Sequence, residues 1–298
     1  MSLFDSLVDE ALRNQRELAP LRTVIEKELL HHDILRVLSG AGLLTNLTFI
    51  GGTCLRACYG SNRLSEDLDF TGGADFTRDQ LATMGEVLAQ GLKDKYGLHV
   101  DVVAPVRDEG NVDTWKLKVI TRPERRDIPA QRINIDVCAI PSYERRPLML
   151  RNHYEVEMGT SGLILQAQSC EEIFSDKLVA FALRPNRIKN RDLWDLGWLH
   201  QKGIKPSLNL VALKLADHRA DTQNYLNAFT ARVNSLTTDP KVAKDFQNEM
   251  NRFLPNYIVN ETVSTHDFWI YLSALLGSYL QEVRSALSGH EPSNLFKM

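Results

Sequence analysis

Two aspartates in the stretch Ser65-Glu66-Asp67-Leu68-Asp69-Phe70 have a spacing that could do chemistry. We expect an extended strand over 67–70, so the side chains of Asp67 and Asp69 leave the same face of it. Two carboxylates a few ångströms apart repel each other unless a cation joins them. Their oxygens suit Mg²⁺, which proteins typically hold with one or two carboxylates together with substrate phosphates. The pair therefore predicts a magnesium site for a phosphate-containing substrate.

Asp136 is a candidate third ligand. It interrupts the apolar alternation of Ile133-Asn134-Ile135-Asp136-Val137, within a strand that we expect over 132–140. An ionised aspartate inside a sheet must be paired or must bind a metal. If this strand lies beside the 67–70 strand, the three carboxylates can hold two Mg²⁺ ions, an arrangement that serves in-line attack on phosphorus. The alternative is an exposed edge strand that leaves Asp136 in solvent.

A glycine pair precedes the acidic strand in Phe49-Ile50-Gly51-Gly52-Thr53. We expect Gly51 and Gly52 to connect a strand at 47–50 to a helix at 53–59. Glycine lets the backbone approach a ligand closely, and a helix N-terminus presents free N–H groups to an anion. The Thr53 hydroxyl can add a donor, and Ser65 can either bind a phosphate or cap the turn into the strand. Each feature alone is common, but their combination favours a phosphate-binding site.

A second group of charged residues follows on two expected helices, 170–184 and 189–201. Lys177 supplies a point charge suited to a phosphate, and Asp192 and Asp195 lie three residues apart on one helix face. The basic loop 184–191 between the helices could meet a triphosphate or an RNA backbone. All of these are also ordinary features of solvated helix faces and loops.

The periodicity of the chain divides it into two regions. Amphipathic helices are expected at 3–17 and 20–40, strands at 47–50, 67–70, 99–103, 115–121 and 132–140, and a further helix at 77–96. Beyond about residue 168 only helical patterns remain. Strands followed by helices predict an α+β fold, with a mixed-sheet core and N-terminal helices over 1–160 and a mainly helical domain over 161–298.

Composition excludes several classes of protein. The 298 residues are 43% hydrophobic and carry a net charge of −3, which excludes a bulk-basic nucleic-acid coat but not a local basic groove. The longest uncharged apolar stretch, 268–280, is shorter than the roughly 20 residues that a membrane-spanning helix needs. Acidic residues within 1–18 disfavour a secretory signal, and four cysteines do not make a disulfide framework in a chain of this length. We therefore expect a cytoplasmic protein without membrane contact.

The motifs resemble those of a known family. Gly-Gly-Thr at 51–53, a short helix, and Ser-Glu-Asp-Leu-Asp-Phe at 65–70 are similar to the core of polymerase-β type nucleotidyltransferases. More narrowly, they resemble the AbiEii/AbiGii nucleotidyltransferase toxins of type IV toxin–antitoxin and phage-defence systems, to which the MenT toxins are related. The segments 172–180 and 191–196 resemble the second block of this family. The similarity covers about residues 47 to 200.

The resemblance implies a polymerase-β-like mixed sheet and Mg²⁺-dependent transfer of a nucleoside monophosphate from an NTP to RNA. By analogy the acceptor is the 3′ end of tRNA, the result is blocked translation, and a cognate antitoxin is a partner. We further expect Gly52 and Thr53 to cradle the β- and γ-phosphates. The resemblance implies that Lys177 contacts nucleotide phosphates and that Asp192 supports the site.

Two other functions are compatible with the same motifs. One is a transferase that modifies a protein hydroxyl, since the same site would serve it. The other is a catalytically idle module that binds a nucleotide or a partner. The intact pair of Asp67 and Asp69 argues against the idle module, because a retired site has no physical reason to keep mutually repelling carboxylates.

Overall fold

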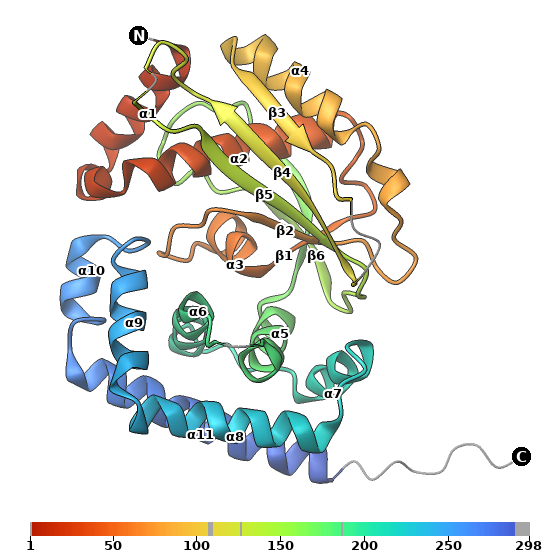
Figure 1. Cartoon of the computed structure of the whole chain (residues 1–298), viewed down its shortest axis with the longest axis vertical. Helices are drawn as coiled ribbons and strands as arrows, with labels where there is room; N and C mark the ends of the chain where they lie inside the picture. Colours follow the sequence, from red (N-terminus) through yellow and green to blue (C-terminus); the bar gives the residue numbers. More distant parts are fainter. Residues whose placement is uncertain (1, 107–109, 126, 186, 290–298) are drawn as a thin grey trace, which may run out of the picture. The chain divides into compact units, whose positions relative to one another are not determined.

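A computed structural model describes residues 2–106, 110–125, 127–185 and 187–289 (Figure 1). The chain forms two compact units, each with its own core. The first unit comprises Met1–Ser169 with Phe253–Pro255, and the second comprises Cys170–Arg252 with Asn256–Met298. The main division thus falls between Ser169 and Cys170. The boundary predicted from the sequence lies between residues 160 and 161.

The first unit is built on a seven-stranded mixed sheet in the order β3-β4-β5-β2-β1-β7-β6. The strands are β1 (Thr48–Ile50), β2 (Leu68–Thr71), β3 (His99–Val103), β4 (Val112–Ile120), β5 (Gln131–Cys138), β6 (Arg145–Met149) and β7 (Ile164–Gln168). The pairs β2·β5 and β1·β7 are parallel, and the other neighbours are antiparallel. Strands distant in the chain therefore lie side by side at the centre of the sheet.

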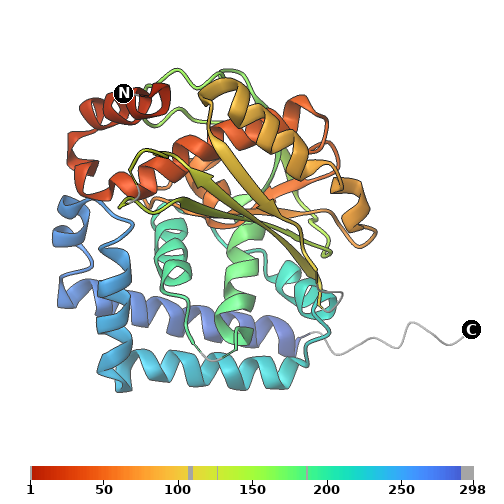
Figure 2. The same ribbon diagram turned by 45° about the horizontal axis from the view of Figure 1, so that its top comes forward.

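Helices cover one face of this sheet. The helical segments of the first unit are α1 (Leu3–Asn14), a 3₁₀ turn (Arg16–Leu21), α2 (Arg22–Gly40), α3 (Gly51–Cys54), a π turn (Leu55–Tyr59), a second 3₁₀ turn (Arg78–Leu81) and α4 (Met84–Tyr96). Figures 1 and 2 show α2 and α4 on the same side of the sheet, where α2 contacts β5 and α4 contacts β3. Ile133, Ile135 and Val137 of β5 are buried on this side. The alternate residues Asn134 and Asp136 lie half-buried on the other face.

Two strands of the sheet, β6 and β7, were not predicted. β6 begins with Arg145, Arg146 and Pro147, and proline inside a run argues against a strand except at a sheet edge. β6 lies at such an edge, paired only with β7 in the described sheet. β7 is short and alternates little. Two expected helices also differ, because 3–17 ends at Asn14 and 77–96 begins as the Arg78–Leu81 3₁₀ turn.

The second unit is helical. Its helices are α5 (Cys170–Leu183), α6 (Asn190–Gln201), α7 (Leu208–Asp217), α8 (Thr222–Thr238), α9 (Pro240–Met250), α10 (Asn256–Glu261) and α11 (His266–Ser288). Aromatic pairs join the helices: the ring centroids of Phe174 and Tyr279 lie 5.0 Å apart, and those of Phe181 and Phe229 lie 5.3 Å apart. The expected helices at 170–184 and 189–201 correspond to α5 and α6. Among the described residues, no helix has the length and apolar character that a membrane crossing requires.

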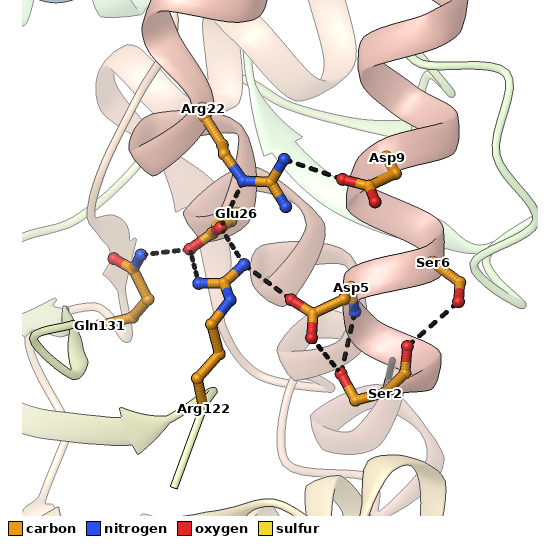
Figure 3. Close-up of polar contacts among 8 residues, drawn as sticks. All are labelled: Ser2, Asp5, Ser6, Asp9, Arg22, Glu26, Arg122 and Gln131. Carbon is orange, nitrogen blue, oxygen red and sulfur yellow. Dashed lines mark hydrogen bonds and ion pairs between the residues drawn. The ribbon is translucent and has the colours of Figure 1, made fainter. Parts of the chain in front are cut away.

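A charged network fixes α1 and α2 to the sheet (Figure 3). The guanidinium of Arg122, which follows β4, lies 2.7 Å from Asp5 of α1 and 2.6 Å from Glu26 of α2. Gln131 of β5 donates a second hydrogen bond of 2.6 Å to Glu26. The side chain of Glu26 is 3% exposed, so its charge depends on these partners. Hydrogen bonding to Glu26 outweighs partial burial and raises the pKa of Arg122.

We predict that Arg122→Met destabilises the protein by about 2–4 kcal/mol, because it leaves a buried carboxylate without its main cation. Arg125→Met is the matched control: Arg125 pairs with Asp127 at 2.8 Å, but both side chains are more than half exposed, at 58% and 66%, so we expect no measurable change. Urea denaturation of the two variants measures the difference. Equal stability of the two variants would show that the network does not hold the helices.

Candidate active site

The three predicted carboxylates lie along one face of the sheet. Asp69 of β2 and Asp136 of β5 are register partners in the parallel pair, so their side chains share a face at a strand spacing of about 4.8 Å. Asp67 precedes β2, and its Oδ1 accepts hydrogen bonds of 3.2 Å from the backbone and side-chain amides of Asn134. All three aspartates are half-buried. The central β2·β5 pairing therefore brings them together from distant parts of the chain.

This donor set fits Mg²⁺ chemically, because it consists of carboxylate oxygens, the ligands that Mg²⁺ prefers. Asp67, Asp69 and Asp136 would be its ligands. Within the described residues, however, no three His, Cys, Asp or Glu side chains converge closely enough to hold a metal ion. The metal-binding role of these aspartates stays a prediction.

Gly51 borders the acidic pair. It follows Ile50, the register partner of Asp69, and it has a φ of +75°, which disfavours any residue with a side chain. A Cβ at this position would lie 2.9 Å from Oδ2 of Asp69. Glycine is thus required for two independent reasons. Together with Gly52 it starts α3, which begins two residues before the predicted helix start at Thr53.

Thr53 and Ser65 have buried side chains that bind each other. Their hydroxyl oxygens lie 2.5 Å apart, and the Thr53 hydroxyl also donates to the backbone carbonyl of Asp67. The two hydroxyls therefore tie the start of α3 to the loop that leads into β2. Their direct contact with phosphate stays a prediction, and so does that of Gly51 and Gly52. The backbone N–H groups of the first helical turn are the groups that a helix start offers to an anion.

Helix α2 holds the loop before the acidic strand. The backbone N–H of Ser65 donates 2.8 Å to Glu28, and the side chain of Lys27 lies 2.8 Å from that of Glu66. His31 Nε2 lies 3.0 Å from the Glu66 carbonyl. Sequence reasoning missed these residues. Their signal is that Glu28 and His31 stand beside the apolar residues Leu29, Leu30 and Ile34 of α2, where buried polar groups need specific partners.

Glu28 is the centre of a buried charged cluster. Arg56 of the π turn lies 3.1 Å from Glu28, and the hydroxyl of Tyr154 donates to the same carboxylate. Burial works to raise the pKa of Glu28, but the charge of Arg56 and the Tyr154 hydrogen bond outweigh it, so that this pKa is lowered. Burial also raises the pKa of Tyr154. The cluster fixes the π turn, a distortion that is often found beside functional sites.

The predicted second block forms a compact ion-paired group within the second unit. The ammonium of Lys177 on α5 lies 2.8 Å from Asp192 and 2.8 Å from Asp195 of α6. The three side chains are 8%, 8% and 0% exposed. Burial works to raise the pKa of Asp192, but Lys177 and neighbouring cations lower it. The spacing of the two aspartates thus lets both of them pair with the buried Lys177. Phosphate binding by Lys177 stays a prediction.

Two arginines of the basic loop 184–191 form ion pairs within the second unit. Arg184 lies 3.3 Å from Asp192, and Arg191 lies 3.4 Å from Glu249. Asn186 lies outside the described residues. Charge in this loop is therefore balanced locally, at least at these two arginines.

A mixed sheet that places carboxylates of two central strands beside a Gly-Gly-Thr helix start is the arrangement that the family resemblance predicts for a nucleotidyltransferase. The sequence model described as nucleotidyl transferase AbiEii toxin, type IV toxin–antitoxin system, matches residues 33–274. The chain belongs to this family, which confirms the predicted resemblance and fold class. The match includes the helices beyond residue 205, in which sequence analysis recognised no motif.

A solved toxin structure shows the same fold. MenT4, a nucleotidyltransferase toxin of Mycobacterium tuberculosis, superposes with a TM-score of 0.57 at 17% identity, over 95% of this chain and 98% of that chain. JHP933 of Helicobacter pylori has a TM-score of 0.48 at 19% identity, over 89% of this chain and 97% of that chain. No curated protein matched the sequence.

We predict that Gly51→Ala displaces the Asp69 carboxylate, because the new methyl group would meet it at 2.9 Å. Gly73→Ala is the matched control: its φ is +81°, and its added Cβ would meet nothing within 4 Å. Both changes carry the strain of a left-handed alanine, about 1–2 kcal/mol. Thermal unfolding should show a larger loss for Gly51→Ala than for Gly73→Ala. Equal losses of thermal stability would mean that the Asp69 carboxylate moves aside at no cost in stability.

Lys177→Met should destabilise the protein by about 3–5 kcal/mol, because two buried carboxylates lose their shared cation. Lys205→Met changes an exposed lysine of the same unit and should leave the stability unchanged. Chemical denaturation at neutral pH distinguishes the two. A Lys177→Met protein as stable as the wild type would contradict a structural role for the ion-paired group.

Proposed function

We propose that this nucleotidyltransferase uses Mg²⁺ to transfer a nucleoside monophosphate from an NTP to the 3′-hydroxyl of an RNA. The acceptor that we propose is tRNA, and the consequence is blocked translation. The observation that carries the proposal is the register pairing of Asp69 with Asp136, with Asp67 on the same face. Such a row of oxygen ligands beside a helix start suits phosphoryl chemistry at a triphosphate.

In this mechanism the attacking 3′-oxygen forms a bond to the α-phosphorus while the bond from the α-phosphorus to the bridging oxygen breaks, and pyrophosphate leaves. Asp67 and Asp69 would hold Mg²⁺, and Asp136 would complete the ligand set and help to accept the proton of the attacking hydroxyl. Bound Mg²⁺ supplies neutralisation of the charge on the phosphates. The backbone N–H groups of Gly52 and Thr53 would orient the β- and γ-phosphates.

The remaining assigned residues act through position or charge. Ser65 keeps Thr53 in place through their hydrogen bond, and Gly51 leaves room for Asp69. In our proposal Lys177 neutralises charge on the triphosphate, and Asp192 orients the Lys177 ammonium.

Membership of a type IV toxin–antitoxin family supports an NTP substrate and an antitoxin partner. We propose that the toxin acts in the cytoplasm, that growth arrest follows from modified tRNA, and that this arrest limits the spread of phage. Transfer to a protein hydroxyl is the rival reaction, since it would use the same carboxylates. A module that only binds nucleotides is the rival without chemistry.

We predict that the purified protein, incubated with labelled NTPs, Mg²⁺ and total tRNA, places label on RNA. Asp69→Asn should lower the rate at least about 100-fold, because several kcal/mol of transition-state stabilisation are lost with a metal ligand. Asp67→Asn should have a similar effect. Asp113→Asn is the control: Asp113 lies on β4 of the same sheet, on the side of the helices, and pairs with Arg78 at 2.8 Å.

Label on protein but not on RNA would identify the rival transferase. NTP binding in calorimetry without any pyrophosphate release would identify the idle module. Full activity of both Asp67→Asn and Asp69→Asn would overturn the mechanism.

A further inference from the structure

Beyond the carboxylates, the same face of the sheet becomes basic. The register pairs three residues of β5 with three of β4: Asp136 with Thr114, Asn134 with Lys116, and Arg132 with Lys118. Side chains of paired residues share a face. Lys116, Lys118 and Arg132, which we call the basic platform, are all exposed.

The charges of the basic platform are weakly balanced. Among the described residues, neither Lys116 nor Arg132 has a carboxylate within ion-pair distance. Lys118 lies 3.4 Å from Asp101 of β3, and both side chains are nearly half exposed, at 46% and 45%. Asp101 also accepts a 2.8 Å hydrogen bond from His99. Three cations facing one carboxylate give this part of the sheet a net positive charge in solvent.

The platform lies on a defined side of the acidic row. The strand order β4-β5-β2-β1 places Asp69 and Asp136 between the helix start that follows β1 and the basic residues of β4 and β5. In-line transfer requires the attacking hydroxyl and the leaving pyrophosphate to lie on opposite sides of the phosphorus. With the triphosphate at Gly52 and Thr53, the acceptor must approach from the platform side.

The dimensions also fit an extended chain. Residues of one face recur about every 6.6 Å along a strand, so Arg132 lies about 13 Å from Asp136, with Asn134 between them. Polar side chains occupy the whole interval. A polyanion that crosses this face meets several cations in sequence, whereas a free triphosphate needs only one cluster.

We propose that the basic platform binds the phosphate backbone of the acceptor RNA and leads its 3′ end to Asp136. The identity of the acceptor rests on the proposed function. Lys116 is the nearest contact to the reacting end, and Lys118 and Arg132 hold the preceding phosphates.

The test uses the full-length chain with Lys116→Gln, Lys118→Gln and Arg132→Gln, singly and combined. Lys93→Gln is the control, because Lys93 is an exposed lysine on α4, which covers the opposite face of the sheet. The probe is a fluorescent single-stranded RNA that ends in a free 3′-hydroxyl. Its affinity is measured by anisotropy over a series of salt concentrations, and circular dichroism checks the fold of each variant.

The triple variant should bind the RNA at least about tenfold more weakly, and the slope of log K against log salt should flatten by about 2, from three contacts at about 0.7 each. In the transfer assay the KM for RNA should rise while the KM for NTP stays unchanged. Lys93→Gln should match the wild type in every measurement.

Unchanged RNA affinity and an unchanged salt slope in the triple variant would contradict RNA binding by the basic platform. This holds even if the wild type labels RNA and the proposed function stands. Conversely, the wild type could transfer no nucleotide and yet bind RNA in a way that depends on the basic platform. That result would overturn the proposed function but support RNA binding by the platform. A wild type that binds no RNA at low salt, or that labels only protein, would also overturn the platform.

Discussion

Backbone pairing of β2 with β5 holds Asp69 and Asp136 side by side although their charges repel. At about 5 Å and an effective dielectric constant of about 20, two carboxylates repel by roughly 3 kcal/mol. The apolar residues that precede them resist this repulsion, because Leu68 and Ile135 are register partners that are fully buried on the helix side. A shift of the strand register by one residue would move the buried side chains to the other face of the sheet and the aspartates into the core. The core thereby enforces an arrangement that the acidic groups alone would avoid, and a bridging cation would relieve it.

The loop that enters the acidic strand is fixed by polar contacts rather than by packing alone. Ser65 is held from one side by Glu28 of α2 and from the other by Thr53 of α3. Arg56 and Tyr154 in turn fix Glu28. Buried polar networks of this kind add little net stability but strongly penalise alternative geometries. The position of Asp67 therefore depends on residues that do not lie on the sheet.

Local patterns in the sequence predict much of this molecule. The alternation around Asp136, the i,i+3 pair of Asp192 and Asp195, and the glycines before α3 each indicate their element, and family motifs supply the fold class. Contacts between distant residues leave no such pattern. The pairing of Arg56 with Glu28 and the register of Lys116 with Asn134 depend on tertiary structure. β6 was missed because its arginines and proline are atypical of a strand.

Those residues of β6 have a consequence for assembly. β6 closes one edge of the sheet, where exposed backbone groups can recruit a strand from another molecule. Pro147 lacks an N–H group there, and the exposed charge of Arg145 would repel a second copy of the same edge. Strand addition at this border is thus disfavoured. A partner that binds at this border would therefore contact side chains rather than extend the sheet.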